Sequence, residues 1–184
     1  MTQRAPGKRA GLQQADVVAA ARSLLDEDGA SGVTVRAVAR SLGVHPNAVY
    51  TYTADRDQLL DRALDDLLGD IDEPATAAPI AGLIAMMEAT YDVLVAHPGA
   101  VEGYVQRQGA RGDNAQRLGR RMDTWLTDLD IDDVDAARSV LIVHAIGAAA
   151  FAVGGSFGSP DPDSARSRFQ NSLRWLISGI TSSG

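Results

Sequence analysis

The chain of 184 residues contains no cysteine, and Lys8 is its only lysine. Without cysteine it has no disulfide framework and no thiolate metal site, which fits a reducing cytoplasm. Aromatic residues make up only 5% of the sequence, but hydrophobic residues make up 45%, enough for a packed interior. No strand pattern and no internal repeat occur, so the sequence predicts an all-α fold.

Long hydrophobic runs are also missing. The longest, Val140 to Val153, is about 14 residues and includes His144 and Gly147, whereas a membrane span needs about 20 residues. We therefore predict a buried helix there, no contact with a membrane and a cytoplasmic location. The first eleven residues are basic with no apolar core after them, which argues against a signal peptide.

Negative charge is unevenly distributed along the chain. Residues 1–60 carry seven Lys or Arg against six Asp or Glu, whereas residues 61–184 carry ten against eighteen. The net charge of −7 therefore comes from the second part of the chain. This asymmetry supports two functional parts. We predict a disordered basic tail over residues 1–11, one domain over residues 12–60 and a second domain over residues 61–184.

Hydrophobic periodicity predicts a series of helices along the chain. The expected ranges are about 13–28, 55–70, 80–96, 100–109, 114–129, 133–156 and 161–179, besides two short helices around a tight turn in the stretch that begins at Thr34. Thr34, Asp55 and either Asp132 or Asp133 are expected to cap helix N-termini. The helix over residues 55–70 has an apolar face too wide for one partner, so we expect it to link the two domains.

The stretch from Thr34 to Leu60 has the spacing of a helix-turn-helix. Ala39 and Gly43 stand four residues apart: the small residue lets the second helix approach, and the glycine supplies the positive φ that ends the first. The second helix starts at Pro46. Its outer side, with His45, Asn47 and Tyr50, is expected to lie in the major groove of DNA.

The same residues resemble the DNA-binding domain of the TetR family of one-component repressors. The matching elements are Thr34, Ala39, Gly43-Val44, Val49-Tyr50, Tyr52, Arg56 and Leu59-Leu60. His45 departs from the usual Ser or Thr, and Thr53 from a common Phe or Val. The resemblance covers about residues 12 to 60. The residues that we expect to contact DNA are Thr34, Val35, Arg36, His45, Pro46, Asn47, Tyr50, Tyr52 and Arg56.

Other chemistry finds little support in the sequence. An EF-hand starting at Asp128 would need Gly at its sixth position and Glu at its twelfth, where Asp133 and Ser139 stand. The histidines lie in separate elements with no metal-binding spacing. No nucleophile, base and orienting group come together, and no serine stands in a GxSxG turn. We therefore predict no enzyme activity, no cofactor and no metal.

The family resemblance implies a ligand cavity among the middle helices. Aromatic and methionine side chains there are often plain core, yet they also suit a mainly apolar ligand. For His144, a satisfied core histidine and a ligand contact are equally compatible with the sequence. The expected ligand-binding residues are Met87, Tyr91, Tyr104, Met122, Trp125, His144 and Phe151.

The last two predicted helices are suited to dimerisation as a four-helix bundle between subunits. Small residues on one face allow close approach, and Trp175 adds a large contact area. The expected interface residues are Val143, Gly147, Ala150, Gly154 and Trp175.

The predicted function is a TetR-like repressor that binds double-stranded operator DNA as a homodimer and is released by a small-molecule effector. One alternative is an activator or nucleoid-type factor without a ligand, which a well-packed second domain lacking a cavity would support. A second alternative, an α-helical enzyme, would need a cluster of titratable groups.

Overall fold

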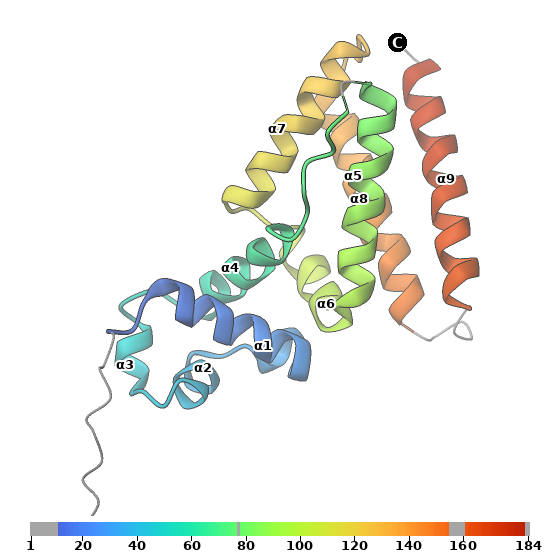
Figure 1. The fold of residues 1–184 in the computed structure, drawn as a ribbon. Helices are drawn as coiled ribbons and strands as arrows, with labels where there is room; N and C mark the ends of the chain where they lie inside the picture. The colour runs from blue at the N-terminus through green and yellow to red at the C-terminus, as the bar shows by residue number, and fades with distance from the viewer. Residues whose placement is uncertain (1–10, 77, 155–160, 183–184) are drawn as a thin grey trace, which may run out of the picture.

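The computed structural model describes residues 11–76, 78–154 and 161–182, and within these ranges it contains helices and no strand. The helices are α1 (Gln14–Gly32), α2 (Val35–Ser41), α3 (Pro46–Val49), α4 (Arg56–Leu68), α5 (Pro79–Ala96), α6 (Pro98–Arg107), α7 (Asp113–Asp128), α8 (Val134–Val153) and α9 (Pro162–Ser182). The all-α prediction is confirmed. Helices α1 to α4 gather at one end of the molecule and α5 to α9 at the other (Figure 1). The predicted basic tail lies outside the described residues.

The turn between α2 and α3 has the features predicted from its sequence. The Oγ1 atom of Thr34 accepts a hydrogen bond of 3.1 Å from the N–H of Ala37, which caps α2. Gly43 adopts a φ of 65°, the left-handed region that favours glycine. Val38 and Val49 are fully buried beneath the turn. A capped first helix and a glycine turn therefore fix the position of α3.

Helix α3 is short. It begins at Pro46 as predicted but ends at Val49, and the residues from Tyr50 to Tyr52 form a turn. The Nδ1 atom of His45 accepts a hydrogen bond of 3.3 Å from the N–H of Asn47. His45 therefore caps α3, at a position where short polar side chains are more usual.

Helix α4 lies between the two ends of the molecule. Asp55 caps it through a hydrogen bond of 2.8 Å from the N–H of Gln58 to Oδ1. Its buried residues include Leu59, Leu60, Leu64 and Leu67. These side chains allow α4 to pack against α1, α5, α6 and α7. The predicted linking role of this helix in the packing is confirmed.

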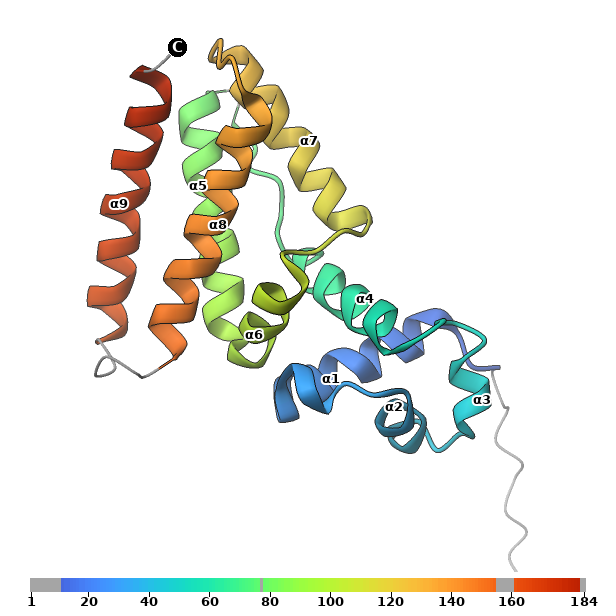
Figure 2. The ribbon, with the colours of Figure 1, turned by 180° about the vertical axis from the view of Figure 1, so that it is seen from behind.

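Helices α5, α8 and α9 run side by side, and α7 crosses them at an angle (Figures 1 and 2). Asp133 caps α8 through a bond of 2.9 Å from the N–H of Ala136 to Oδ1. By length and composition alone, α5 and α8 are apolar enough to cross a membrane. Both instead pack against neighbouring helices of this chain, α5 against α6, α7, α8 and α9, and α8 against α5, α6, α7 and α9.

The prediction of a buried helix over Val140–Val153 is wrong for the single chain. Only Ala137, Leu141, Ala145 and Ala149 of α8 are buried. Val143 is 67% exposed, although it belongs to the same apolar run. Because α8 is apolar on every side, the sequence does not distinguish the face packed inside the chain from the face on its surface.

Helices α1 and α6 approach each other at the level of their backbones. A Cβ atom added to Gly99 would overlap the carbonyl oxygen of Leu25 and lie 3.3 Å from the Cα of Gly29. Gly29 itself has a φ of 69° and marks a kink in α1. Position 99 therefore has no room for a side chain, and this contact joins the two ends of the molecule directly (Figure 2).

Candidate DNA-binding surface and ligand cavity

The helix-turn-helix presents a polar surface. Arg36, His45 and Asn47 are exposed, and Tyr50 is 54% exposed. Arg36 lies in α2 and Asn47 in α3, while His45 directly precedes α3 and Tyr50 directly follows it. Thr34 and Pro46 are half-buried at the starts of the two helices. We call the exposed set of Arg36, His45, Asn47 and Tyr50 the DNA face.

Three other residues that we predicted to contact DNA have partners inside the protein. Val35 is buried, so a contact there would have to come from its backbone. The hydroxyl of Tyr52 donates to the carbonyl of Leu12. The Nη2 atom of Arg56 donates to the carbonyl of Ala30 over 2.7 Å. The hydrogen bonds of Tyr52 and Arg56 hold the helix-turn-helix against α1 and the segment before it in the free protein.

A cavity of about 430 Å³ lies on the other side of α4. Helices α5, α7 and α8 form most of its walls, and α4, α6 and the loop after α6 close the end nearest the DNA-binding helices. Its size falls within the usual range for small-molecule sites, about 300 to 1,000 Å³. The lining residues are Leu68, Met86, Met87, Thr90, Leu94, Tyr104, Gln108, Gly109, Ala110, Arg111, Ala115, Gln116, Leu118, Gly119, Arg120, Met122, Asp123, Arg138, Ile142 and Ile146.

Only part of the predicted ligand set lines this cavity. Met87, Tyr104 and Met122 do so, while Tyr91 and Trp125 are buried outside its lining. The Nε2 atom of His144 lies 3.0 Å from Oγ of Ser172, and its ring stacks on Phe169. Burial lowers the pKa of His144, which favours the neutral imidazole. Phe151 is 68% exposed.

The discrepancy comes from the orientation of α8. The predicted ligand set placed His144 and Phe151 of this helix at the cavity. In the structure Arg138, Ile142 and Ile146 line the cavity, and their spacing of four residues places them on one side of the helix. That side differs from the one that carries His144 and Phe151. Sequence reasoning also missed Arg120 and Asp123 on α7.

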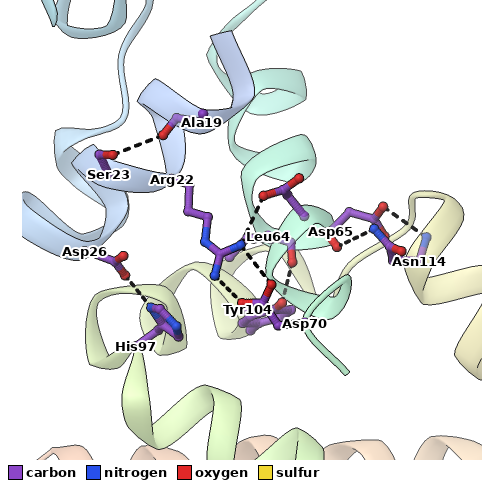
Figure 3. A network of polar contacts seen from close by, with 11 residues as sticks. Ala19, Arg22, Ser23, Asp26, Leu64, Asp65, Asp70, His97, Tyr104 and Asn114 are labelled. Atoms are coloured by element: carbon purple, nitrogen blue, oxygen red, sulfur yellow. Dashed lines mark hydrogen bonds and ion pairs between the residues drawn. The ribbon is translucent and has the colours of Figure 1, made fainter. Parts of the chain in front are cut away.

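Polar contacts connect the cavity region to α1 and α4 (Figure 3). Tyr104 lines the cavity, and its hydroxyl donates to the carbonyl of Leu64 in α4. Burial raises the pKa of Tyr104. Asp65 is 8% exposed and accepts hydrogen bonds from the backbone N–H groups of Asn114 at 3.1 Å and Ala115 at 2.9 Å. The start of α7 is thus fixed to α4.

Two charge-assisted contacts tie α1 to the same region, and both are drawn in Figure 3. Arg22 of α1 pairs with Asp66 of α4, over 3.2 Å, and with Asp70 just beyond it. The Nδ1 atom of His97, between α5 and α6, lies 2.7 Å from Oδ1 of Asp26. These contacts join α1 to α4 and to the segment between α5 and α6.

A second surface feature is an apolar face on α8 and α9. Val143 is 67% and Trp175 is 76% exposed. A Cβ atom added to Gly147 would meet no heavy atom of another helix within 4 Å. Ala150 is half-buried and Gly154 is exposed at the end of α8. All five residues that we predicted for dimerisation are thus at least partly accessible in the single chain.

Among the described residues, no three His, Asp or Glu side chains gather in a group that would hold a metal ion. The arrangement of α1 to α4, with a capped helix-turn-helix and a polar outer surface, is that of a helix-turn-helix domain of the DNA-binding kind. Residues 17–63 match the model of the bacterial regulatory proteins of the tetR family. The helix-turn-helix part of the chain is thus similar to the DNA-binding domain of this family.

Individual proteins are similar to this chain in sequence or in fold. An HTH-type transcriptional regulator of Saccharopolyspora erythraea is 35% identical over 91 residues, which are 48% of this chain and 39% of that protein. BioQ solved with its natural double-stranded DNA operator is 25% identical, with a TM-score of 0.75 over 94% of this chain and 99% of that one. The Streptomyces coelicolor TetR family protein ActR in complex with actinorhodin is 19% identical, with a TM-score of 0.82 over 95% and 98% of the two chains.

Proposed function

We propose that this protein is a transcriptional repressor that binds operator DNA as a homodimer and is released by a small, mainly apolar ligand. The observation that carries the proposal is the contact between the cavity and α4. Tyr104 belongs to the cavity wall and also donates to the carbonyl of Leu64 in α4. The same helix begins at Arg56, next to the turn that follows α3. A ligand that displaces Tyr104 would therefore shift the DNA-binding helices.

DNA recognition is assigned to the DNA face. Arg36 is expected to read a guanine edge and Asn47 a base in the major groove, because side chains of these types form paired hydrogen bonds with base edges. Tyr50 and the N-terminus of α2 would hold the phosphate backbone. Residues 12–60 would form the DNA-binding domain and residues 61–184 the ligand-binding and dimerisation domain, with α4 running across the boundary.

A dimer follows from the geometry of DNA and from the apolar face of α8 and α9. One recognition helix covers only a few base pairs, whereas a two-fold dimer places two of them about 34 Å apart in successive major grooves. The exposed Val143 and Trp175 supply apolar area, and the open space at Gly147 lets a partner helix come close. The two copies would form a four-helix bundle.

Release is a shift between two populations of the dimer. A ligand that favours a different spacing of the two DNA-binding domains removes their fit to the grooves. To change the ratio of DNA-binding to released dimers from 99:1 to 1:99, the ligand must favour the released state by about 5.5 kcal/mol. The ligand-free alternatives, an activator or a nucleoid-type factor, are disfavoured because the structure has a cavity of about 430 Å³.

The experiment begins with selection of bound sites from fragmented genomic DNA, followed by fluorescence anisotropy on the selected site and on random DNA. Arg36→Ala should weaken binding to the selected site far more than binding to random DNA. Arg168→Ala removes an exposed arginine of α9 and serves as the matched control. Equal losses on both DNAs would reassign Arg36 to phosphate contact, and no site preference in the wild-type chain would refute the proposed function.

The oligomeric state is tested by sedimentation of Gly147→Trp. The added ring finds open space within one chain but would overfill a helix contact between two chains. We expect a folded monomer that has lost binding to the selected site. A variant that stays dimeric would place the interface elsewhere.

A further inference from the structure

The charge of the cavity wall is opposite to that of its surroundings. Residues 61–184 carry eighteen acidic against ten basic side chains. The cavity lining has three arginines, Arg111, Arg120 and Arg138, against one acidic residue, Asp123. A positive wall within a negative part of the chain will attract anions and disfavour cations.

One of these arginines is already neutralised. Arg138 pairs with Asp123 across the cavity wall, and its Nη2 atom lies 2.6 Å from Oδ1 of Asp135. Asp123 is therefore engaged and is not a free partner for a cationic ligand. The Nη1 atom of Arg111 donates to the carbonyl of Arg107 over 2.6 Å, a neutral acceptor that leaves the charge of Arg111 uncompensated.

Arg120 differs from the other two. It is exposed on α7, and the structure gives its guanidinium no hydrogen bond or ion pair among the described residues. Gln116 stands one turn earlier on α7 and also lines the cavity, so the two side chains lie on the same side of the helix. An amide N–H and a guanidinium one turn apart form a suitable pair of donors for a carboxylate.

Most of the remaining wall is apolar, apart from Thr90, Tyr104 and Gln108. Methionine, leucine and isoleucine side chains from three helices form it, and several of them are fully buried in the ligand-free chain. They are Met86, Met87, Leu94, Leu118, Met122, Ile142 and Ile146. An amphipathic ligand matches this division, with its charged group at Arg120 and its hydrocarbon portion between α5, α7 and α8.

We propose that the ligand class of this cavity is an apolar carboxylic acid, and that the Arg120 guanidinium, assisted by Gln116, binds its carboxylate. This assignment rests on the proposed function, because it names the chemistry of the effector that would release the DNA. It extends that proposal by predicting which molecules the cavity rejects: neutral and cationic compounds of the same length.

The test measures direct binding of three probes with the same chain length to the full-length protein by isothermal titration calorimetry, below their aggregation concentrations. The probes are decanoate, 1-decanol and decylamine. A charge-assisted contact predicts that decanoate binds about tenfold or more tightly than 1-decanol, with decylamine the weakest. Equal affinities for the three, or tighter binding of decylamine, would overturn the proposal.

Variants identify the site. Arg120→Gln should lower decanoate affinity about tenfold, towards that of 1-decanol, without changing the affinity for 1-decanol. Arg168→Gln is the matched control and should change neither. Gly119→Leu should remove binding of both probes, because a Cβ at this lining position points into free space, 4.0 Å from Cδ of Arg138. Unchanged decanoate binding in Arg120→Gln or in Gly119→Leu would refute the assignment.

A separate readout distinguishes this proposal from the function on which it rests. Decanoate is added to the protein bound to its selected DNA, and release is followed by anisotropy. Arg120-dependent decanoate binding without DNA release would support the ligand class and count against ligand-controlled repression. Release by 1-decanol as readily as by decanoate would support ligand control and overturn the carboxylate assignment.

Discussion

Two arginines of α4 donate to neutral backbone carbonyls in α1 and in the turn after α3, whereas carboxylates of α4, together with Asp70, accept contacts from α1, α6 and α7. Arg56 donates to the carbonyl of Ala30, and Arg62 to that of Tyr52. By contrast, Arg107 of α6 pairs with Asp61 over 2.6 Å, and Arg22 of α1 pairs with Asp70. A carbonyl does not titrate, while exposed ion pairs are screened by salt.

This difference suggests how one helix can serve two purposes. Anchors to the backbone keep the helix-turn-helix intact as a unit. The charged contacts tie that unit to α6 and α7, and each contributes modestly when it is exposed to solvent. Asp65 is the exception, because it is buried and its carboxylate accepts two backbone N–H groups.

The largest expected effect is at Asp65. Asp65→Ala leaves the N–H groups of Asn114 and Ala115 without an acceptor at the start of α7, and should lower the free energy of unfolding by about 3 kcal/mol. Urea denaturation measures this value. Asp72→Ala removes an exposed carboxylate and should change it by less than about 0.5 kcal/mol. Equal losses of stability in the two variants would show that Asp65 does not fix the start of α7 to α4.

Tyr104→Phe tests the link between the cavity and α4. Loss of the hydroxyl removes the hydrogen bond to the carbonyl of Leu64 and should cost about 1 kcal/mol of stability. Affinity for the selected DNA without ligand should stay close to that of the wild type, while the ligand concentration needed for half-release should change. An unchanged half-release concentration would remove Tyr104 from the route of communication.

Tyr52 and Tyr50 form a matched pair for the other end of α4. Tyr52→Phe removes the hydrogen bond to the carbonyl of Leu12 and should cost about 1 kcal/mol of stability or slightly less. Tyr50→Phe should leave stability nearly unchanged, because this side chain is 54% exposed, but it should weaken DNA binding. Thermal unfolding measures the effect of each change on stability, and fluorescence anisotropy measures its effect on DNA binding. A larger loss of stability in Tyr50→Phe than in Tyr52→Phe would contradict the anchoring role of Tyr52.

The smallest expected effect is at Arg22. The Arg22 guanidinium lowers the pKa of Asp70, so their pairing stabilises the folded state above the unfolded carboxyl pKa, near 3.8, and is lost as pH falls through the lower folded pKa. Arg22→Gln should cost about 0.5 kcal/mol at pH 7 and less at pH 3. Urea denaturation at the two pH values checks this. A cost that increases at pH 3 would contradict the ion pair.

Local features of the fold followed from the sequence because their partners are near in the chain. Thr34, Asp55 and Asp133 cap helices three residues from the N–H groups that they accept, and Gly43 ends α2 through its own backbone conformation. Such contacts depend on only a few neighbouring residues. The helix boundaries were therefore predicted to within a few residues, apart from the continuation of α1 past Gly29 to Gly32.

Contacts between distant segments did not follow from the sequence. Arg56 meets Ala30, 26 residues away, and Arg138 meets Asp123 on another helix, and nothing in either local pattern specifies these partners. The cavity face of α8 was misplaced because alanines and valines surround the helix on all sides. Periodicity identifies the buried side of an amphipathic helix, but an apolar helix gives no such signal.

The backbone contact at Gly99 makes this position a point of control for protein engineering. Most positions in a protein interior accept a larger residue after some repacking, since side chains can rotate. The carbonyl of Leu25 belongs to the main chain of α1 and has no such freedom, so even the methyl group of Gly99→Ala would push α1 away from α6. One added carbon atom would therefore change how α1, and with it the helix-turn-helix, is placed on the rest of the chain.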